Sequence, residues 1–521
     1  MKNVPTPSIQ SLLPHTKRPA CVAPRRFVLA SVALLCAAGC NWNSFDKYVE
    51  QAPIRVHPTP SNYGLSSYGA RIATLQTSLA GKQVSTIFAS AGGTTPVAIS
   101  RAWTGSAVTE TGPQLRCHLP GECMGGTDIG AALIPFETWG ANSATPLRNC
   151  VFAPSNSMLP WSANDGRLGG EGFVLCEGSG TVHFAMNEAF LAARANGATM
   201  EFSGFGLPSK HPLGVVIYGA FATDNSTSVR HHGGLYVQAD FVEAAPGMAA
   251  AAPLALAVPL IDPATKAAFT DDPAVGDFGR QVSGSLDANG VLVIAISQPS
   301  RQRVLVASYE GSLPGDPIER FRLRACIAAP DSAPPGFGER ALVGDVTGDG
   351  LPELFIGNDP AFGASPGKQA LFMYAGAGLP PAVSGDTCPA WNQAAVPVVC
   401  ADRAGLRCSG SAFGASLAIG DVDGDQKGDL LVGAPNTTVD GASEAGAVWV
   451  LPGRADGLAL DRAVTLDIGG SAKAHLGAAV AALHTNKRDE PVAGAPGEGK
   501  LFVFMCTPLE TGYGDASECL P

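Results

Sequence analysis

The sequence predicts an all-β fold built from many short strands, because its composition and a repeated pattern both indicate one. Gly (63) and Pro (41) make up about a fifth of the 521 residues, while 15% of the residues are charged and 45% are apolar. Disordered chains show the opposite balance, with high charge and few apolar residues. Short apolar runs separated by Gly and Pro are typical of strands joined by turns. A similar segment returns several times along the chain, which indicates a repeat architecture.

The N-terminus has the features of an export signal. Arg25 and Arg26 precede an apolar run of about a dozen residues, which ends in small residues before Cys40. This run is too short to span a bilayer, which needs roughly 20 apolar residues. Residues 37–40 (Ala-Ala-Gly-Cys) resemble the lipobox of bacterial lipoproteins, although Leu is usual at the first of these positions. The resemblance implies that Cys40 is acylated and that Asn41 favours the outer membrane; a plain signal peptide cut nearby is the alternative.

The chain that follows this leader is acidic. Residues 1–39 contain five basic residues and no acidic ones, so the net charge of −11 becomes −16 from Cys40 onward. A chain this acidic repels phosphate backbones and anionic lipid headgroups. We therefore expect no nucleic acid partner, and attachment to the membrane of the bacterial cell envelope only through the N-terminal lipid. The negative charge is compatible with the binding of cations.

Cysteines are present in an even number beyond the leader. Of the thirteen, Cys21, Cys36 and Cys40 lie in the leader or at its end, and ten remain. An even number in an exported chain predicts disulfides, although the sequence does not fix the pairing. Neighbouring positions suggest these pairs: Cys117–Cys123, Cys150–Cys176, Cys400–Cys408 and Cys506–Cys519, which leaves Cys326 and Cys388. The alternative, a metal site, has weak support because no Cys-x-x-Cys occurs.

Four segments in the second half of the chain follow one pattern. Each has a large apolar residue followed by Gly, then an apolar strand, and later a second strand that ends near Gly-Ala-Pro or a similar group. Phe413-Gly414 and Gly433-Ala434-Pro435 show the pattern in full. The four segments are 278–311, 337–375, 413–453 and 476–506. Together with fainter copies, they give Gly-Ala-Pro-like centres at seven positions: 89, 153, 219, 297, 357, 433 and 494.

These segments resemble FG-GAP repeats, the blade units of the integrin α-subunit head. The resemblance implies a seven-bladed β-propeller over residues 61–521, preceded by a lipoprotein signal peptide over 1–39 and a lipid-anchored linker over 40–60. A four-stranded sheet cannot bury both of its faces alone, so blades stack around an axis and ring closure limits exposed edges. The residues of the repeated pattern are then core and turn residues rather than a functional site.

Two acidic loops follow the Phe-Gly positions at the same distance. They are 345–353 (Asp-Val-Thr-Gly-Asp-Gly-Leu-Pro-Glu) and 421–429 (Asp-Val-Asp-Gly-Asp-Gln-Lys-Gly-Asp). Oxygen ligands at loop positions 1, 3, 5 and 9, with a backbone carbonyl from position 7, suit one cation with the size and flexible coordination of calcium. The expected ligands are Asp345, Thr347, Asp349, Leu351 and Glu353 in the first loop, and Asp421, Asp423, Asp425, Lys427 and Asp429 in the second.

A solvated acidic turn is the alternative interpretation, because Asp and Gly are common in turns. Two nine-residue matches at the same offset favour calcium, and clustered carboxylates repel one another unless a cation lies among them. Each loop departs once from the pattern, with Thr347 in place of an acid and Gln426 in place of the usual Gly. In the integrin resemblance such loops stiffen the propeller on the face opposite the ligand. The two expected Ca²⁺ ions are therefore structural.

The function follows from these features and from the motifs that do not occur. The sequence contains no Gly-x-Ser-x-Gly elbow, His-Glu-x-x-His helix, Walker loop or Rossmann fingerprint. We therefore expect a calcium-stabilised binding or adhesion module, not an enzyme, that recognises a protein or glycan at the surface or in the periplasm. A calcium-dependent polysaccharide lyase or hydrolase is an alternative, because propellers host catalysis in their central channel. A structural component of the envelope is another.

Overall fold

The computed structural model describes an all-β chain. The protein divides into two compact units, 1–42 and 43–521, and all described residues belong to the second unit. Between residues 54 and 266, the structure describes the strands and a few residues next to them. The longest described stretches are 277–309, 321–358, 371–383, 388–400, 410–469, 471–485 and 488–505. Within all these ranges, no helix has the length and apolar character needed to cross a bilayer.

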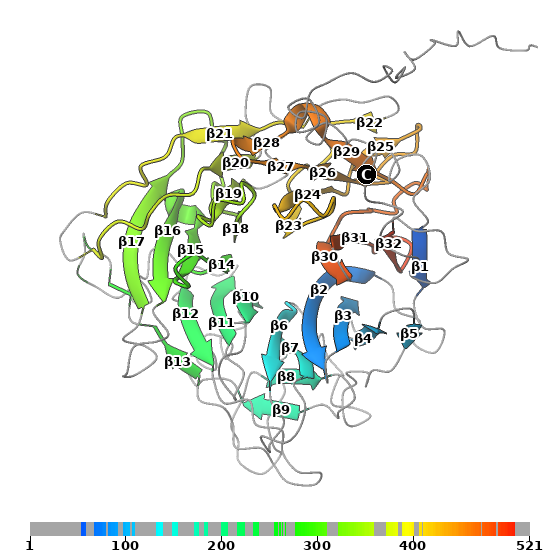
Figure 1. Ribbon diagram of the computed structural model, residues 1–521, viewed down its shortest axis with the longest axis horizontal. Coiled ribbons are helices and arrows are strands. Elements are labelled where there is room, and N and C mark those ends of the chain that lie inside the picture. The colour runs from blue at the N-terminus through cyan, green and yellow to red at the C-terminus, as the bar shows by residue number, and fades with distance from the viewer. Residues whose placement is uncertain are drawn as a thin grey trace, which may run out of the picture. The chain divides into compact units, whose positions relative to one another are not determined.

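The described residues form seven antiparallel sheets of four strands each (Figure 1). The first three are β2 (Tyr68–Leu79), β3 (Lys82–Ala91), β4 (Val97–Thr104) and β5 (Ala107–Thr109); β6 (Ile134–Thr138), β7 (Arg148–Pro154), β8 (Glu171–Cys176) and β9 (Val182–Ala185); and β10 (Thr199–Gly206), β11 (Val216–Thr223), β12 (Gly233–Gln238) and β13 (Ala255–Ala257). In each of these sheets the strands lie in chain order, as expected for consecutive hairpins.

Three of the remaining four sheets follow the same order. They are β14 (Val282–Leu286), β15 (Leu292–Gln298), β16 (Arg303–Tyr309) and β17 (Phe321–Ala328); β18 (Arg340–Gly344), β19 (Glu353–Gly357), β20 (Leu371–Tyr374) and β21 (Ala395–Val398); and β23 (Ser416–Gly420), β24 (Asp429–Ala434), β26 (Ala447–Leu451) and β29 (Val464–Leu466). Two short pairs lie beside the last of these: β22 (Leu406–Arg407) with β25 (Thr438–Val439), and β27 (Gly453–Arg454) with β28 (Gly457–Leu458). Six of the seven predicted Gly-Ala-Pro-like centres fall in the second strand of one of these six sheets, and the seventh, at position 494, falls in a strand of the remaining sheet.

The seventh sheet joins the two ends of the described chain. Its strands β30 (Val480–Thr485), β31 (Arg488–Ala495) and β32 (Lys500–Phe504) are completed by the N-terminal strand β1 (Ile54–Pro58), which pairs antiparallel with β32. The sequence assigned residues 40–60 to a linker and began the propeller at 61. The structure differs here, because β1 lies within that range and is part of the last sheet.

Burial explains why the inner strands read as continuous apolar runs. Every residue of β15 (Leu-Val-Ile-Ala-Ile-Ser-Gln) is buried, as expected for a strand covered on both faces by neighbouring sheets. In β17, the outermost strand of the same sheet, buried residues alternate with exposed or half-buried ones. This period of two is that of a strand with one covered face. The apolar face of each sheet is therefore buried against another sheet.

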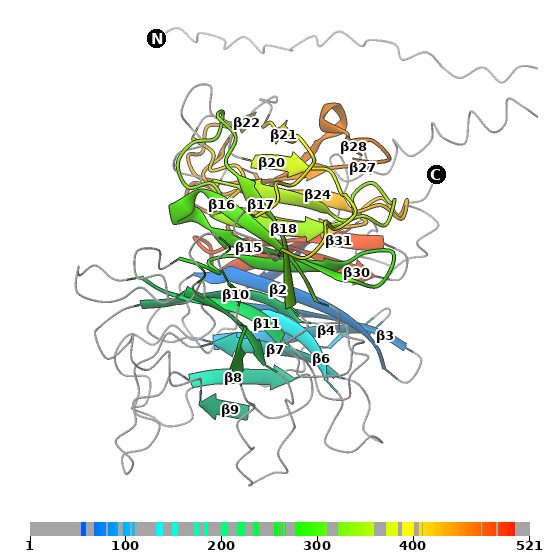
Figure 2. The same cartoon turned by 90° about the vertical axis from the view of Figure 1, so that its left-hand side faces the viewer.

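Buried apolar residues of neighbouring sheets belong to common hydrophobic clusters, and the rings of Phe152 and Tyr218 lie 5.5 Å apart. One pair of residues, drawn from one cluster or ring contact, illustrates each interface: Phe88 and Val151, Phe152 and Tyr218, Ile217 and Ile294, Val293 and Leu354, Phe355 and Val432, Leu431 and Ala493, and Val503 and Ile87. The last pair joins the seventh sheet to the first. The inner strands β30 and β2 also contact each other, and both views of the molecule show them side by side (Figures 1 and 2). This arrangement of radially packed sheets is a β-propeller.

A backbone hydrogen bond joins the Phe-Gly and Gly-Ala-Pro positions within each C-terminal sheet. The N–H of Gly414 donates to the carbonyl oxygen of Gly433 at 3.1 Å, and Gly414 has a φ of 93°, which favours glycine. The corresponding bonds run from Gly279 to Ser297 (2.9 Å), from Gly338 to Gly357 (3.0 Å) and from Gly477 to Gly494 (3.0 Å). The large residue before each glycine is buried: Phe278, Phe337, Phe413 and Leu476. The repeated pattern therefore encodes one turn and one core position in each of these sheets.

Candidate metal centre

Both predicted loops connect the first strand of a sheet to its second strand. Residues 345–353 run from the end of β18 into β19, and residues 421–429 run from the end of β23 into β24. The two loops are hydrogen-bonded to each other, because the N–H of Gly428 donates to the carbonyl oxygen of Asp345 at 3.1 Å. The strands on either side fix where each loop begins and ends, so the acidic side chains gather at one edge of the two sheets.

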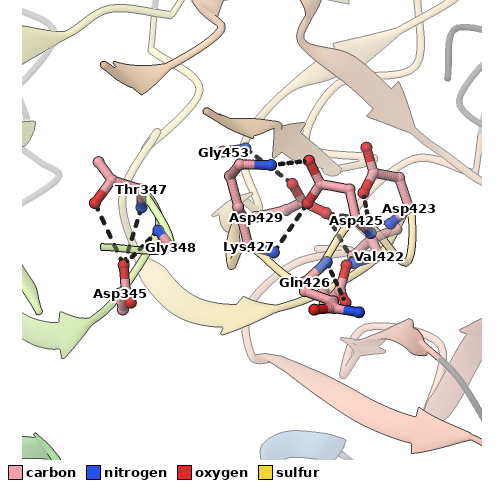
Figure 3. A network of polar contacts seen from close by, with 11 residues as sticks. Asp345, Thr347, Gly348, Val422, Asp423, Asp425, Gln426, Lys427, Asp429 and Gly453 are labelled. Atoms are coloured by element: carbon pink, nitrogen blue, oxygen red, sulfur yellow. Dashed lines mark hydrogen bonds and ion pairs between the residues drawn. The ribbon is translucent and has the colours of Figure 1, made fainter. Parts of the chain in front are cut away.

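In the second loop the structure brings three of the predicted ligands together. Asp421, Asp423 and Asp429 each offer a carboxylate oxygen, and these three oxygens lie within 4.8 Å of one another. The Asp429 side chain is fully buried and that of Asp423 is nearly so. Figure 3 shows Asp423 and Asp429, together with Val422 and Gly453, whose backbone N–H groups donate to Asp429. The arrangement is compact enough for one cation to contact all three carboxylates.

Burial and the charges of neighbouring carboxylates raise the pKa of each of these carboxyls. Burial, followed by the charge of Asp425, raises the pKa of Asp423 to about 6. Burial and then the charge of Asp423 raise the pKa of Asp429 well above its usual range. Burial is also the main cause of the raised pKa of Asp421. Oxygen Oδ1 of Asp421 is buried and has no hydrogen-bond partner among the residues that the structure describes. A cation at this position would supply both the missing partner and the missing positive charge.

Asp425, the predicted ligand at position 5, does not join this cluster. Its Oδ2 lies 2.5 Å from Nζ of Lys427, and its Oδ1 accepts a hydrogen bond of 2.9 Å from the Lys427 backbone N–H. The hydrogen bond to Asp425 is the main reason why the pKa of the Lys427 ammonium is raised, so this group carries a positive charge. Gln426, which lies between Asp425 and Lys427 in the sequence, has a φ of 71° at the loop position where the calcium pattern has Gly.

The first loop differs at its first position, because its backbone satisfies both carboxylate oxygens of Asp345, whereas Oδ1 of Asp421 has no hydrogen-bond partner in the described part of the second loop. Oxygen Oδ1 of Asp345 accepts from the N–H of Gly348 at 2.7 Å, and Oδ2 accepts from the N–H of Gly350 at 2.8 Å. Asp349 accepts from the N–H of Leu351 at 2.7 Å. In the described part of this loop the predicted ligands Asp345, Thr347, Asp349, Leu351 and Glu353 do not form a cluster of three carboxylates.

The ninth position is held in the same way in both loops. Glu353 and Asp429 each begin the second strand of their sheet, and each is almost fully buried. Each accepts a hydrogen bond of 2.8 Å from the backbone N–H at the loop's second position, Val346 or Val422. Burial is the main cause of the raised pKa of Glu353, and the charge of Asp345 adds to it. The buried acid therefore fastens the loop to the strand behind it.

Each buried acid has a second backbone partner that was not predicted from the sequence. The N–H of Gly376 donates to Glu353 at 3.2 Å, and the N–H of Gly453 donates to Asp429 at 2.9 Å. Both glycines come two residues after the third strand of their sheet, β20 or β26. This repeated position of Gly after the third strand is the signal that could have identified them.

The last sheet also contributes to the second loop. Oδ2 of Asp489 accepts from the backbone N–H of Asp421 at 2.8 Å, and the N–H of Asp489 donates to the Asp421 carbonyl at 2.7 Å. Nδ1 of His484 lies 2.6 Å from Oδ1 of Asp489. These contacts were not predicted from the sequence, because the turn between β30 and β31 has too few acids for a calcium loop.

Disulfides join two of the cysteine pairs that the sequence suggests. Cys326 is bonded to Cys388, and Cys400 is bonded to Cys408. Cys150 is also disulfide-bonded, and it lies opposite Cys176 in the pairing of β7 with β8. Five other predicted positions lie outside the described residues: Cys40, Cys117, Cys123, Cys506 and Cys519.

Comparison with known proteins finds one family match. The FG-GAP repeat family model matches residues 413–451, the range that contains β23, the second acidic loop, β24 and β26. No curated protein matches the chain.

Several solved structures match the chain at low similarity. An α-L-arabinofuranosidase from Lactobacillus brevis is 8% identical, with a TM-score of 0.32, over 64% of this chain and 98% of its own. A mutant of AofleA from Arthrobotrys oligospora is 10% identical, with a TM-score of 0.34, over 81% and 93%. The exotype rhamnogalacturonan lyase YesX is 9% identical, with a TM-score of 0.29, over 80% of both chains. Scores this low support no conclusion about activity. What the comparisons establish is that this β-propeller carries an FG-GAP repeat at residues 413–451.

Proposed function

We propose that the chain is a calcium-stabilised binding or adhesion module, and not an enzyme, that recognises a protein or a glycan. The calcium part rests on one observation, the cluster of Asp421, Asp423 and Asp429, whose carboxylate oxygens lie within 4.8 Å of one another. The ligands are all oxygens, as calcium requires, and the buried Oδ1 of Asp421 lacks a hydrogen-bond partner in the described part of the chain. The FG-GAP match covers the whole of this loop.

The scaffold of the proposed module is a propeller of seven blades, one for each four-stranded sheet. Two observations support closure of the ring between the seventh and the first sheet. The apolar residues Val503 and Ile87 belong to one buried cluster, and β30 contacts β2. A closed ring leaves no open blade face, which suits a rigid platform that presents loops to a partner.

The proposed role of calcium is structural. A cation held by Asp421, Asp423 and Asp429 would neutralise carboxylates that otherwise repel one another in the loop between β23 and β24. Because the unfolded chain lacks this cluster, calcium binds the native state and stabilises it by about 2.7 kcal/mol at a hundredfold excess over Kd. A second and weaker calcium ion is proposed at 345–353, where Asp345 must first exchange some of its hydrogen bonds from the loop backbone.

The test is a calcium titration of the chelator-treated chain from Asn41 onward, by calorimetry and by thermal unfolding. We expect binding together with a large rise in Tm. Asp423→Asn should weaken the tighter site and Asp349→Asn the weaker one. Asp461→Asn is the control, because this aspartate has a 74% exposed side chain outside both loops. A chain whose Tm is the same in calcium and in chelator would refute the calcium proposal.

The anchoring part of the proposal needs its own test. We propose that export is followed by acylation of Cys40, which would hold the module on the bacterial envelope, in the outer membrane. Labelling of cells with a palmitate analogue should mark the wild-type protein but not Cys40→Ser. Cys36→Ser, a neighbouring cysteine within the leader, is the matched control. Equal labelling of both variants would place the lipid elsewhere, and no labelling of the wild type would favour a plain signal peptide.

A further inference from the structure

We propose that Lys427 competes with calcium for the 421–429 loop: its ammonium holds Asp425 in the cation-free loop and must release it when calcium binds. This inference rests on the proposed calcium site and concerns its regulation. It assigns the side chain of Lys427 a role in tuning affinity, whereas the calcium pattern uses only the backbone carbonyl at that position.

The first argument is the position of Asp425. Three carboxylates of the loop lie together within 4.8 Å, but the fourth is instead paired with Lys427, with 2.5 Å between Oδ2 and Nζ. Both side chains are largely shielded, with 28% of Lys427 and 18% of Asp425 exposed. A largely shielded ion pair is less screened by solvent than a pair on the open surface. Asp425 must give up this pair before it can bind a cation.

The second argument is that the neighbouring loop holds the lysine in place. A Cβ atom built on Gly348 would lie 3.0 Å from Cγ of Lys427 and 3.6 Å from its Cδ, so the aliphatic stem rests on that glycine. The backbone next to it is also fixed, because the N–H of Gly428 donates to the carbonyl of Asp345. The stem is therefore positioned by the first loop, and the ammonium is directed toward Asp425 (Figure 3).

The third argument concerns charge. The loop holds four carboxylates, Asp421, Asp423, Asp425 and Asp429, and the ammonium of Lys427 reduces their net repulsion when no metal is bound. A divalent cation placed among the same carboxylates repels the ammonium a few ångströms away. The lysine therefore stabilises the cation-free loop and weakens calcium binding. The first loop has Leu351 at the equivalent position and has no such competitor.

The experiment compares Lys427→Met with the wild-type chain, because Met keeps most of the aliphatic stem and removes the charge. Calorimetry should show calcium binding about tenfold tighter in the variant. In chelator its Tm should be lower than that of the wild type, and the calcium-induced rise in Tm should be larger. Lys427→Arg keeps the positive charge and should retain affinity close to that of the wild type.

The matched control is Lys500→Met. Lys500 also pairs with an acid two residues before it, with 2.6 Å between its Nζ and Glu498 Oε2, but it lies in the last sheet. This variant should bind calcium as the wild type does. Equal Kd values for Lys427→Met and the wild type would overturn this inference but leave the proposed calcium site intact. If neither protein binds calcium, the proposed function fails and this inference fails with it.

Discussion

Gly494 lies directly against the backbone of Gly69: a Cβ atom built on Gly494 would be 1.8 Å from the Gly69 carbonyl oxygen. Gly494 belongs to the last sheet and Gly69 to the first. The same contact joins Gly433 of the sixth sheet to Gly477 of the seventh, at 2.1 Å. The junction between the chain's last and first sheets is therefore built like a junction between consecutive sheets.

Gly494→Ala should destabilise the fold by overpacking this junction. The conformation of Gly494 lies outside the left-handed region, so the effect is steric, and we expect a loss of about 2–3 kcal/mol in the free energy of unfolding. Denaturant unfolding measures it. Gly378→Ala is the control, since a Cβ there would meet no atom within 4 Å. Equal stability of the two variants would contradict a closed junction between the first and last sheets.

The pairing of β1 with β32 predicts that residues 54–58 are needed for a stable last sheet. A chain that begins at residue 61 leaves the β32 edge unpaired, so it should unfold at lower temperature and aggregate more than the chain from 43. A chain that begins at residue 51 keeps β1 and should behave like the longer one. If all three chains have the same Tm, β1 contributes nothing to the stability of the fold, and residues 40–60 are a linker as the sequence predicts.

The sequence predicted the local features of this fold better than its long-range pairings. The Phe-Gly glycine and the Gly-Ala-Pro centre recur because one hydrogen bond joins them, as between Gly414 and Gly433, so their spacing is visible in the chain. Strand β1 carries no such signal. Its five residues pair with a strand more than 440 positions away, between Ile54 and Phe504, and no local pattern specifies that partner.

In the candidate site, too, the local features were predicted from the sequence and the contacts between distant residues were not. The acids at 421–429 were predicted from spacing, since alternate positions of a tight loop face inward. The pairing of Asp425 with Lys427 was not predicted, because the Asp425 carboxylate can bind either calcium or the Lys427 ammonium. The position of the lysine also depends on Gly348, which lies in the loop of another sheet. Asp489 was passed over for the same reason: its partner, Asp421, lies 68 residues earlier.

Gln426→Gly should stabilise the second loop. Gln426 has a φ of 71°, a left-handed conformation that costs a non-glycine residue roughly 1 kcal/mol, and Gly350 has a φ of 80° at the equivalent position of the first loop. The N–H of residue 426 donates to Asp421 at 3.0 Å, and glycine keeps this bond. Thermal unfolding in chelator should therefore show a higher Tm. Gln426→Ala keeps the strain and should show no gain; a gain in that variant would mean that the glutamine side chain, not the backbone, is unfavourable.

His484 should make stability depend on pH. Its hydrogen bond with Asp489 is the main cause of its raised pKa, and the charges of Asp489 and Asp421 add to the effect against burial. Because the folded pKa lies above the unfolded value of about 6.5, the protonated form favours folding. This contribution is complete below pH 6.5 and is lost as the pH rises through the folded pKa. The Tm difference between wild type and His484→Gln should therefore be constant below about pH 6.5 and shrink above it, and a difference that stays constant at higher pH would exclude this linkage.

Thr347→Asp should convert the first loop into a stronger calcium site. The Thr347 hydroxyl lies 3.3 Å from Oδ1 of Asp345 and 3.2 Å from Oε1 of Glu353, so an acid there would face two other carboxylates. Their repulsion should lower the Tm in chelator, while calcium binding at this loop should become about tenfold tighter because the ion gains a charged ligand. Calorimetry of the Asp423→Asn background isolates the first loop. Thr347→Asn, which adds an oxygen without charge, is the control, and equal affinity of the two variants would mean that residue 347 does not reach the ion.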